Sequence, residues 1–207
     1  MTAKVVWIEG MDGTGKSVLA HALAIVALED PRYRQDYRPG VLELRQPTTS
    51  EIGKLIRLGI RGDVVSRKAL LYLFLADAVD CEERNKHEIN RQSLIIFDRH
   101  ARVSGSVYQV TEHDEAKVQL AYQSYQFREP DLLVILDLPH EKLEARWHGR
   151  RKTLEIYEQA DLIYLKRMRE RYLACSWWWP EKTLVLDADM PTPSQVEKIL
   201  ERLKEMP

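Results

Sequence analysis

A glycine-rich stretch near the start of the sequence restricts the possible folds more than any other feature. Residues 10–17 read Gly-Met-Asp-Gly-Thr-Gly-Lys-Ser and match the pattern G-x-x-x-x-G-K-[ST] at every fixed position. The apolar run Val5–Ile8 precedes the motif, and the helix-forming segment Val18–Leu28 follows it. A preceding strand and a following helix are the context in which this pattern forms a phosphate-binding loop, or P-loop. The motif therefore predicts an α/β fold with a nucleoside triphosphate site.

Each residue type in the predicted P-loop has a physical reason. Glycines let backbone N–H groups converge on phosphate oxygens, and the N-terminus of the next helix adds partial positive charge. Lys16 is expected to reach the β- and γ-phosphates, and the Ser17 hydroxyl is expected to ligate Mg²⁺. The residues predicted to bind the nucleotide in this loop are Gly10, Met11, Asp12, Gly13, Thr14, Gly15, Lys16 and Ser17.

Short apolar runs of strand length recur along the chain and are separated by segments long enough for helices. The runs are mostly apolar and do not alternate with polar residues, as expected of strands covered on both faces of a parallel sheet. The alternation of strand and helix predicts a three-layer α/β sandwich, but it does not give the order of the strands. The predicted strands are Val5–Ile8, Val41–Leu44, Leu94–Phe97, Leu132–Leu136 and Leu184–Leu186. The predicted helices are 17–29, 51–60, 66–91, 114–127, 140–150, 158–175 and 193–205.

Composition narrows the class of protein. The chain has 207 residues, 44% of them hydrophobic, which fits one domain over residues 1–207 with its own core. With 31 Lys+Arg against 32 Asp+Glu, the charge balance gives no reason to expect nucleic acid as a partner. The first nine residues lack the layout of a signal peptide, and no run of about 18 uncharged apolar residues occurs. We therefore expect a cytoplasmic protein with no membrane partner.

Charged residues follow the third apolar run and the helix after the fourth. Asp98 and Arg99 end the run Leu94–Phe97, where an acidic residue beside a P-loop can hold the Mg²⁺ shell and an arginine can clamp a second phosphate. An ordinary strand-end turn is the alternative for this pair. The basic stretch 146–152 can supply arginines that close over a transferred phosphoryl group. By itself this stretch is more typical of a solvated helix end.

Taken together, these motifs resemble the thymidylate kinases, P-loop enzymes that pass the γ-phosphate of ATP to a deoxynucleoside monophosphate. The resemblance extends over nearly the whole chain. It includes the P-loop with its internal acidic residue, a loop similar to Arg-Glu-Pro, a helix that presents an aromatic ring, and an Asp-Arg-His signature. The segments that carry it are Ile8–Ser17, Arg45–Pro47, Ser50–Gly53 with Arg57, Leu73–Asp77, Asp98–His100 with Ser104 and Tyr108-Gln109, Pro130–Asp137, Arg171–Leu173 and Leu186–Ala188.

The resemblance implies roles for single residues. Phe74 would stack on the base, and Asp12 would accept a hydrogen bond from the sugar 3′-hydroxyl or shape the Mg²⁺ shell. The implied substrate-binding residues are Asp12, Arg45, Arg57, Phe74, Arg99, Ser104, Tyr108 and Gln109, while Ala188 joins the ATP site. The implied catalytic residues are Lys16, Asp12, Asp98, Arg99, Arg146, Arg150 and Arg151, with Ser17 and Asp98 as metal ligands. It also implies Mg²⁺ as cofactor, ATP as phosphate donor, a lid segment at about 146–157 and a homodimer.

Three departures from the family pattern affect specificity and the lid. Ala78 stands where relatives usually have an arginine that reads the pyrimidine edge, which predicts a broader base range unless Gln109 or Arg102 substitutes. The segment after the lid reads Glu155-Ile-Tyr-Glu158 and lacks the usual arginine. One extra residue between His100 and Tyr108 leaves the serine role open to Ser104 or Ser106.

The function that follows from the resemblance is transfer of the γ-phosphate of ATP to dTMP to give dTDP. A related deoxynucleoside monophosphate kinase with a different or broader base range is one alternative. The other is a nucleotide-binding or NTPase switch module without an acceptor. Arg45, Arg57 and Arg99 argue against the switch, because a module without an acceptor needs no second cluster of phosphate-binding arginines.

Overall fold

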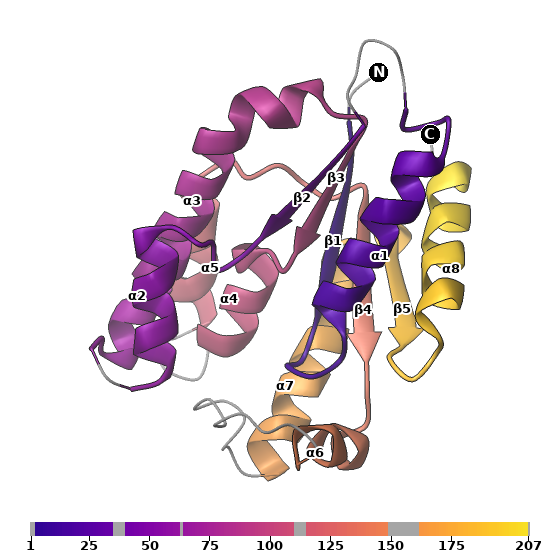
Figure 1. The fold of residues 1–207 in the computed structure, drawn as a ribbon. Coiled ribbons are helices and arrows are strands. Elements are labelled where there is room, and N and C mark those ends of the chain that lie inside the picture. The colour runs from indigo at the N-terminus through magenta and orange to yellow at the C-terminus, as the bar shows by residue number, and fades with distance from the viewer. Residues whose placement is uncertain (1–2, 35–39, 63, 110–114, 149–161, 207) are drawn as a thin grey trace.

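The sheet at the centre of the molecule contains five parallel strands in the order β2-β3-β1-β4-β5 (Figure 1). The computed structural model describes residues 3–34, 40–62, 64–109, 115–148 and 162–206. The strands are β1 (Lys4–Gly10), β2 (Val41–Arg45), β3 (Leu94–Asp98), β4 (Leu132–Asp137) and β5 (Thr183–Asp187). Because the strands are parallel, all their carboxyl ends lie at one edge of the sheet.

The apolar runs of the sequence occupy the centre of this sheet. Every residue of β3 is buried, as are nearly all of β1 and β4, whereas β2 and β5 at the edges are half-buried. Burial on both faces explains why the three central strands are mostly apolar. Trp7 and Phe97 are among the largest fully buried side chains of the main core.

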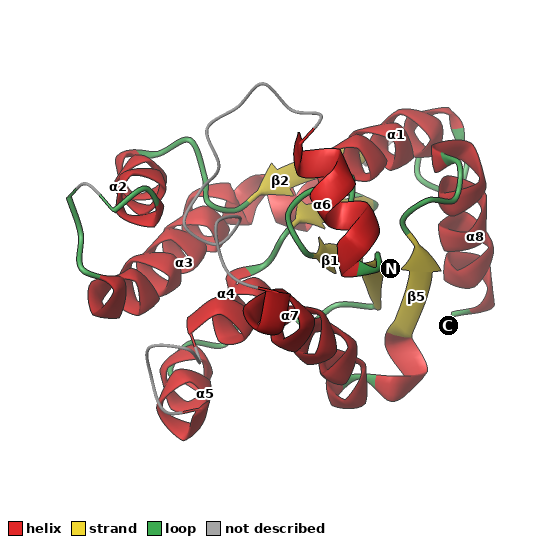
Figure 2. Cartoon of the chain, turned by 90° about the horizontal axis from the view of Figure 1, so that it is seen from below, coloured by secondary structure: helices red, strands yellow, loops and turns green. Residues whose placement is uncertain are grey.

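Helices cover the sheet on both faces, which gives three layers (Figure 2). On one face α1 packs with α8, and on the other α4 packs with α7. The helices are α1 (Lys16–Glu29), α2 (Glu51–Ile60), α3 (Arg67–Arg91), α4 (Ala101–Gln109), α5 (Glu115–Gln123), α6 (His140–His148), α7 (Leu162–Ala174) and α8 (Thr192–Glu205). Short 3₁₀ turns at Cys175–Trp178 and Pro180–Lys182 lead into β5. In the described part of the chain, no helix combines the length and apolar character needed to span a membrane.

A second apolar cluster lies away from the main core, between α2, α3, α4 and α5. Its buried members include Ile56 from α2, Phe74 and Ala78 from α3, Ala101 from α4 and Tyr122 from α5. The helix pair α2–α3 is therefore attached to the sheet largely through α4. This arrangement decides where the side chains of α2 and α3 stand relative to the carboxyl ends of the strands.

Most predicted elements are confirmed, and α4 is the main error. All five predicted strands form, each within two residues of its predicted bounds. Helix α4 was not predicted, because its Ser-Gly-Ser centre has low helix propensity. Gly105 is required there, since a Cβ atom at this position would lie 1.8 Å from the hydroxyl oxygen of Tyr122. Of the predicted lid segment 146–157, the first three residues belong to α6, and 149–157 lie outside the described residues.

We expect the substitution Gly105→Ala to destabilise the protein by about 1–3 kcal/mol, because the added methyl group overpacks the contact between α4 and α5. Urea denaturation of both proteins measures the difference. The background Tyr122→Leu supplies the control, since it removes the ring that the methyl group meets. If Gly105→Ala costs as much in that background as in the wild type, the contact with Tyr122 is not the cause.

Candidate active site

The candidate site lies at the edge of the sheet where the strands end. Arg45, the last residue of β2, and Ile8 of β1 are both in register with Asp98, the last residue of β3. The P-loop follows β1 directly, so its residues lie beside these ends. Parallel register thus brings three separate sequence motifs to one place.

The P-loop glycines meet real conformational and steric requirements. Gly10, Gly13 and Gly15 have φ values of 139°, 95° and 98°, a region that residues with a Cβ rarely adopt. A Cβ at Gly13 would lie 2.7 Å from the indole nitrogen of Trp147, which donates a hydrogen bond of 3.0 Å to the carbonyl of Asp12. Gly15 is the N-cap of α1 and has no side chain to cap the helix. The first N–H groups of α1 are therefore left for an anion.

Lys16 is buried within the loop. Its ammonium group donates a hydrogen bond of 2.6 Å to the carbonyl of Met11, and only 6% of the residue is exposed. Burial and the positive charge of Arg99 lower the pKa of Lys16 to about 7. The neutral carbonyl of Met11 is a weak substitute for a phosphate oxygen, so the lysine is poised to exchange it for an anionic partner.

The oxygen atoms predicted to hold Mg²⁺ are adjacent. The Ser17 hydroxyl donates a hydrogen bond of 2.6 Å to a carboxylate oxygen of Asp98, whose other near neighbour is the Arg45 guanidinium at 3.5 Å. Within the described residues, no group of three His, Cys, Asp or Glu side chains could hold a metal. A hydroxyl and one carboxylate fit Mg²⁺, which protein sites of this kind share with substrate phosphates.

Arg99 connects the P-loop to the sheet and to two helices. Its guanidinium pairs with the carboxylate of Asp12 and donates to the Gly10 carbonyl at 3.2 Å. It also donates to the hydroxyls of Ser104 on α4 at 3.0 Å and Tyr172 on α7 at 2.9 Å. Burial opposes ionisation of Asp12, but Arg99 and Lys16 outweigh it and lower the pKa of the carboxyl to about 2. Asp12 is therefore an anion at neutral pH.

Two members of this network, Glu9 and Tyr172, were not predicted to belong to the site. Glu9 is fully buried at the end of β1 and accepts hydrogen bonds from the backbone N–H of His100 at 2.7 Å and the Ser104 hydroxyl at 2.6 Å. Burial raises the pKa of Glu9 to about 7 despite the nearby charge of Arg99. An acidic residue inside an otherwise apolar strand was the signal for Glu9. Tyr172 belongs to the segment Arg171–Leu173 that carries the family resemblance, but that resemblance assigned it no role in the site.

A cleft of about 420 Å³ opens beside the P-loop and extends to α2 and α3. It contains almost all the side chains that were predicted to bind an acceptor. Of the eight, the cleft is lined by Asp12, Arg45, Arg57, Phe74, Arg99, Ser104 and Tyr108. The remaining lining residues are Gln46, Pro47, Thr49, Ile60 and Arg61. A pocket with one aromatic ring and several arginines can hold a flat apolar group together with a multiply charged anion.

Comparison with known proteins agrees with this geometry. A sequence model described as "Thymidylate kinase" matches residues 8–199. The chain belongs to the thymidylate kinase family. It is similar to the "Thymidylate kinase" of Clavibacter michiganensis subsp. michiganensis, at 31% identity over 92% of this chain and 90% of that protein. A "Probable thymidylate kinase" of Thermococcus gammatolerans is 31% identical over 86% and 85%.

The same fold is found in a solved thymidylate kinase from Candida albicans. The two structures superpose with a TM-score of 0.76 at 20% identity, covering 98% of this chain and 92% of the other. The predicted three-layer P-loop fold is thereby confirmed. As a member of the thymidylate kinase family the chain is an ATP-dependent kinase, that is, a transferase.

Some residues considered for base recognition lie elsewhere in this thymidylate kinase family member. Gln109 is 1% exposed and does not line the cleft. Arg102 pairs with Glu129, and its guanidinium lies 5.1 Å from the ring centre of Trp179. Neither Gln109 nor Arg102 lines the cleft, so neither can replace the missing arginine in the geometry described.

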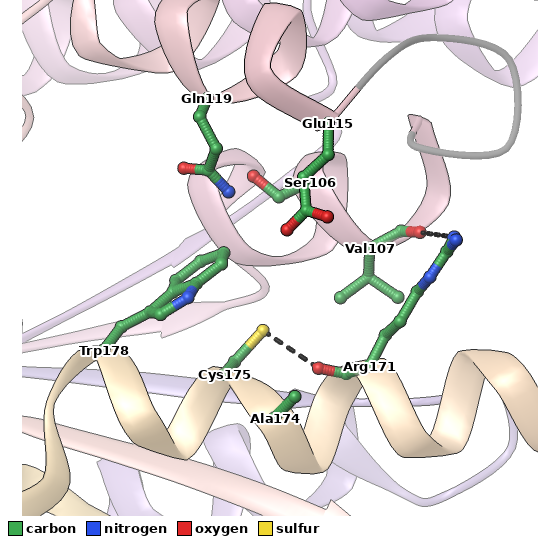
Figure 3. Close-up of a pocket in the computed structure, with 8 residues that line it drawn as sticks. All are labelled: Ser106, Val107, Glu115, Gln119, Arg171, Ala174, Cys175 and Trp178. Atoms are coloured by element: carbon green, nitrogen blue, oxygen red, sulfur yellow. Dashed lines mark hydrogen bonds between the residues drawn. The ribbon is translucent and has the colours of Figure 1, made fainter.

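The open choice between two serines is decided by α4. Ser104 lines the cleft and contacts Arg99, whereas Ser106 donates to the Arg102 carbonyl and faces a separate pocket of about 100 Å³. Figure 3 shows this second pocket, into which side chains from α5 and from the end of α7 point. It is lined by Ser106, Val107, Glu115, Gln119, Arg171, Ala174, Cys175 and Trp178. The residue with the predicted serine position in the site is thus Ser104.

The predicted lid arginines are only partly described. Arg146 on α6 donates to the carbonyls of Gly13 at 3.1 Å and Ala188 at 3.0 Å and pairs with Asp189. It therefore lies between the P-loop and the predicted adenine side, where Ala188 is buried. The other two predicted lid arginines, Arg150 and Arg151, lie outside the described residues.

We expect binding of ATP at pH 7 to take up protons. With a pKa of about 7, Lys16 is uncharged in roughly half of the free molecules, and phosphate groups favour its ammonium form. The same phosphates raise the pKa of Glu9 further, so Lys16 and Glu9 both take up protons when ATP binds. Calorimetric titration in two buffers of different ionisation enthalpy measures the uptake.

The variant Lys16→Arg is the control for this measurement. Arginine stays protonated over the whole range, so the contribution of residue 16 should disappear while that of Glu9 remains. Identical binding enthalpies of the wild type in both buffers would contradict the prediction.

Proposed function

We propose that this protein transfers the γ-phosphate of ATP to dTMP, giving ADP and dTDP. The observation that supports this most directly is the cleft beside the P-loop, which is lined by Arg45, Arg57 and Arg99 and, on α3, by Phe74. Such a pocket suits a nucleoside monophosphate whose phosphate faces the P-loop. A switch module that lacks an acceptor has no use for this second phosphate site.

The side chains support a mechanism based on position and charge. Phosphoryl transfer needs little covalent help from the protein, because catalysis comes from alignment and electrostatic stabilisation. Lys16 and the N–H groups of α1 would hold the phosphates of ATP, while Arg99 and Arg45 would neutralise the acceptor phosphate. An oxygen of that phosphate would attack the γ-phosphorus as the bond to ADP breaks. Asp12, an anion at neutral pH, would accept a hydrogen bond from the sugar 3′-hydroxyl.

Mg²⁺ is proposed as the cofactor, held by Ser17 and Asp98 together with phosphate oxygens of ATP. When bound, it neutralises charge on the phosphates and keeps them in place. The protein's part is to keep the Ser17 hydroxyl and the Asp98 carboxylate side by side, as the 2.6 Å contact between them does. If that contact is released, both oxygens would be available as metal ligands.

The domain, the lid and the oligomeric state are part of the same proposal. We propose one domain over residues 1–207 with a lid segment at about 146–157, in which Arg146, Arg150 and Arg151 act on the transferred group. A homodimer in the cytoplasm is proposed as the working form. Exposed apolar side chains on α2 and α3 support a dimer contact through these two helices, because Leu55 is 41% and Tyr72 is 53% exposed.

The test is the dependence of ADP release on an acceptor. We expect a coupled assay to show ADP release with ATP and dTMP and very little with ATP alone. The variant Lys16→Ala should lower transfer by about 10²–10³-fold, because it removes a preorganised charge from the phosphates. Its unfolding midpoint controls for loss of structure. ATP consumption that is equally fast without any monophosphate would overturn the proposed function.

A second prediction concerns Tyr172, which contacts Arg99 but does not line the cleft. The substitution Tyr172→Phe removes a hydrogen bond to a charged group and should lower kcat/KM for dTMP roughly tenfold or more. The KM for ATP should stay unchanged, since the hydrogen bonds that Tyr172 forms with described residues go to Arg99 and Ser104 and not to the P-loop. The control is Tyr125→Phe, which removes a hydrogen bond of 2.6 Å to Glu83 at the surface. An equal effect of both variants would show that Tyr172 does not position Arg99.

A further inference from the structure

The cleft has two chemically different ends. Asp12 and Arg99 lie at the P-loop end, where the phosphate of an acceptor belongs. Helices α2 and α3, which lie side by side in Figure 1, form the other end. The ring of Phe74 and the side chain of Ile60 are its apolar part. A base stacked on Phe74 would present its edge to whatever polar groups stand at this second end. Those groups decide which bases are accepted.

Ala78 contributes nothing to this end of the cleft. It is 0% exposed and packs inside the second apolar cluster with Phe74 and Ala101. It does not line the cleft. An arginine at position 78 would have to displace its neighbours from a packed core. Base recognition in this protein must therefore come from another element.

Other polar groups that line the cleft are engaged, buried or unselective. The Gln46 carbonyl oxygen accepts a hydrogen bond of 2.7 Å from the backbone N–H of Ala101, which fixes the orientation of the amide. The amide nitrogen of Gln46 has no hydrogen-bond partner among the described residues, but it is buried and shielded from solvent. Arg57 donates to the backbone carbonyls of Pro47 at 3.2 Å and Thr48 at 2.7 Å. The Thr49 hydroxyl can donate or accept, so it does not distinguish a carbonyl from an amino group.

Arg61 differs from all of these. It follows α2 directly, one turn after Arg57, and lines the cleft together with Phe74. Its side chain is exposed and forms no hydrogen bond or ion pair with any residue that the structure describes. A guanidinium only donates hydrogen bonds and stays charged at every relevant pH. It is thus a free donor at the end of the cleft where the base would lie.

We propose that Arg61 selects the base by donating to the 4-carbonyl oxygen of a thymine or uracil stacked on Phe74. The inference rests on the proposed function of the cleft as an acceptor site. Cytosine carries an amino group at position 4, which would place a donor against the guanidinium and leave both unpaired. Arg61, at the end of α2, thereby recognises the edge of the base, a role for which α3 has no suitable side chain. The site accepts pyrimidine monophosphates with a 4-carbonyl group and rejects dCMP.

The test compares kcat/KM for dTMP, dUMP and dCMP in the wild type and in Arg61→Met, which keeps the aliphatic stem without the charge. We expect the wild type to prefer dTMP and dUMP over dCMP by about tenfold or more, the usual effect of a hydrogen bond to a charged group. In Arg61→Met the preference should fall to near unity, with the value for dCMP little changed. Lys54→Ala is the matched control, because Lys54 is a cation on the same helix that pairs with Glu51 outside the cleft.

Three outcomes would overturn the proposal: no preference in the wild type, a preference that survives in Arg61→Met, or an equal fall for all three substrates. The last would assign Arg61 to the phosphate instead of the base. Calorimetric binding of dTMP and dCMP to both proteins separates this result from failure of the proposed function. If no monophosphate stimulates ADP release but the wild type still binds dTMP more tightly than dCMP and Arg61→Met does not, the kinase proposal fails while base reading by Arg61 stands.

Discussion

The ion pair between Arg99 and Asp12 is the interaction on which the rest of the site depends. Arg99 has a φ of 69°, a left-handed conformation that costs a residue with a Cβ about 1–3 kcal/mol. Its backbone N–H donates to the Ile8 carbonyl at 3.0 Å, which ties the end of β3 to β1 and aims the side chain at the P-loop. The strained backbone is thus held by contacts at both ends of the residue. Without this left-handed conformation, the guanidinium would not lie between the proposed sites for the ATP phosphates and for the acceptor phosphate.

The same arginine makes distant helices part of one site. Ser104 comes from α4 and Tyr172 from α7, and both hydroxyls lie within 3.0 Å of the guanidinium. Ser104 also donates to the buried Glu9, so the end of β1 and helix α4 share one hydrogen-bond network. A shift of α4 or α7 would therefore change the hydrogen bonds of Arg99. This explains why α4 must pack closely, with Gly105 against Tyr122.

Sequence patterns were sufficient wherever a local rule applies. The P-loop and the buried central strands follow from patterns within the chain. Seven of the eight residues that the family resemblance assigned to the acceptor line one cleft. Failures occurred where a residue matters because of a partner far away in the sequence. Tyr172 meets Arg99 across 73 positions, and no local pattern indicates that contact. Arg61 lines a cleft whose other residues are distant in the sequence, and no local pattern distinguishes it from any exposed arginine after a helix.

Apart from Arg61, the cations discussed above already have partners, and the kind of partner explains how the site can open for its substrates. Lys16 donates to the carbonyl of Met11, Arg57 to two carbonyls of the loop after β2, and Arg146 to two carbonyls near the P-loop. These carbonyls, together with the Asp189 carboxylate in the case of Arg146, satisfy the buried donors. Phosphate oxygens form stronger, charge-assisted bonds with the same donors. A nucleotide can therefore replace the carbonyls without an intermediate in which a buried charge is unpaired. The Asp12–Arg99 pair is already an ion pair, so it stays in place while the other donors change partners.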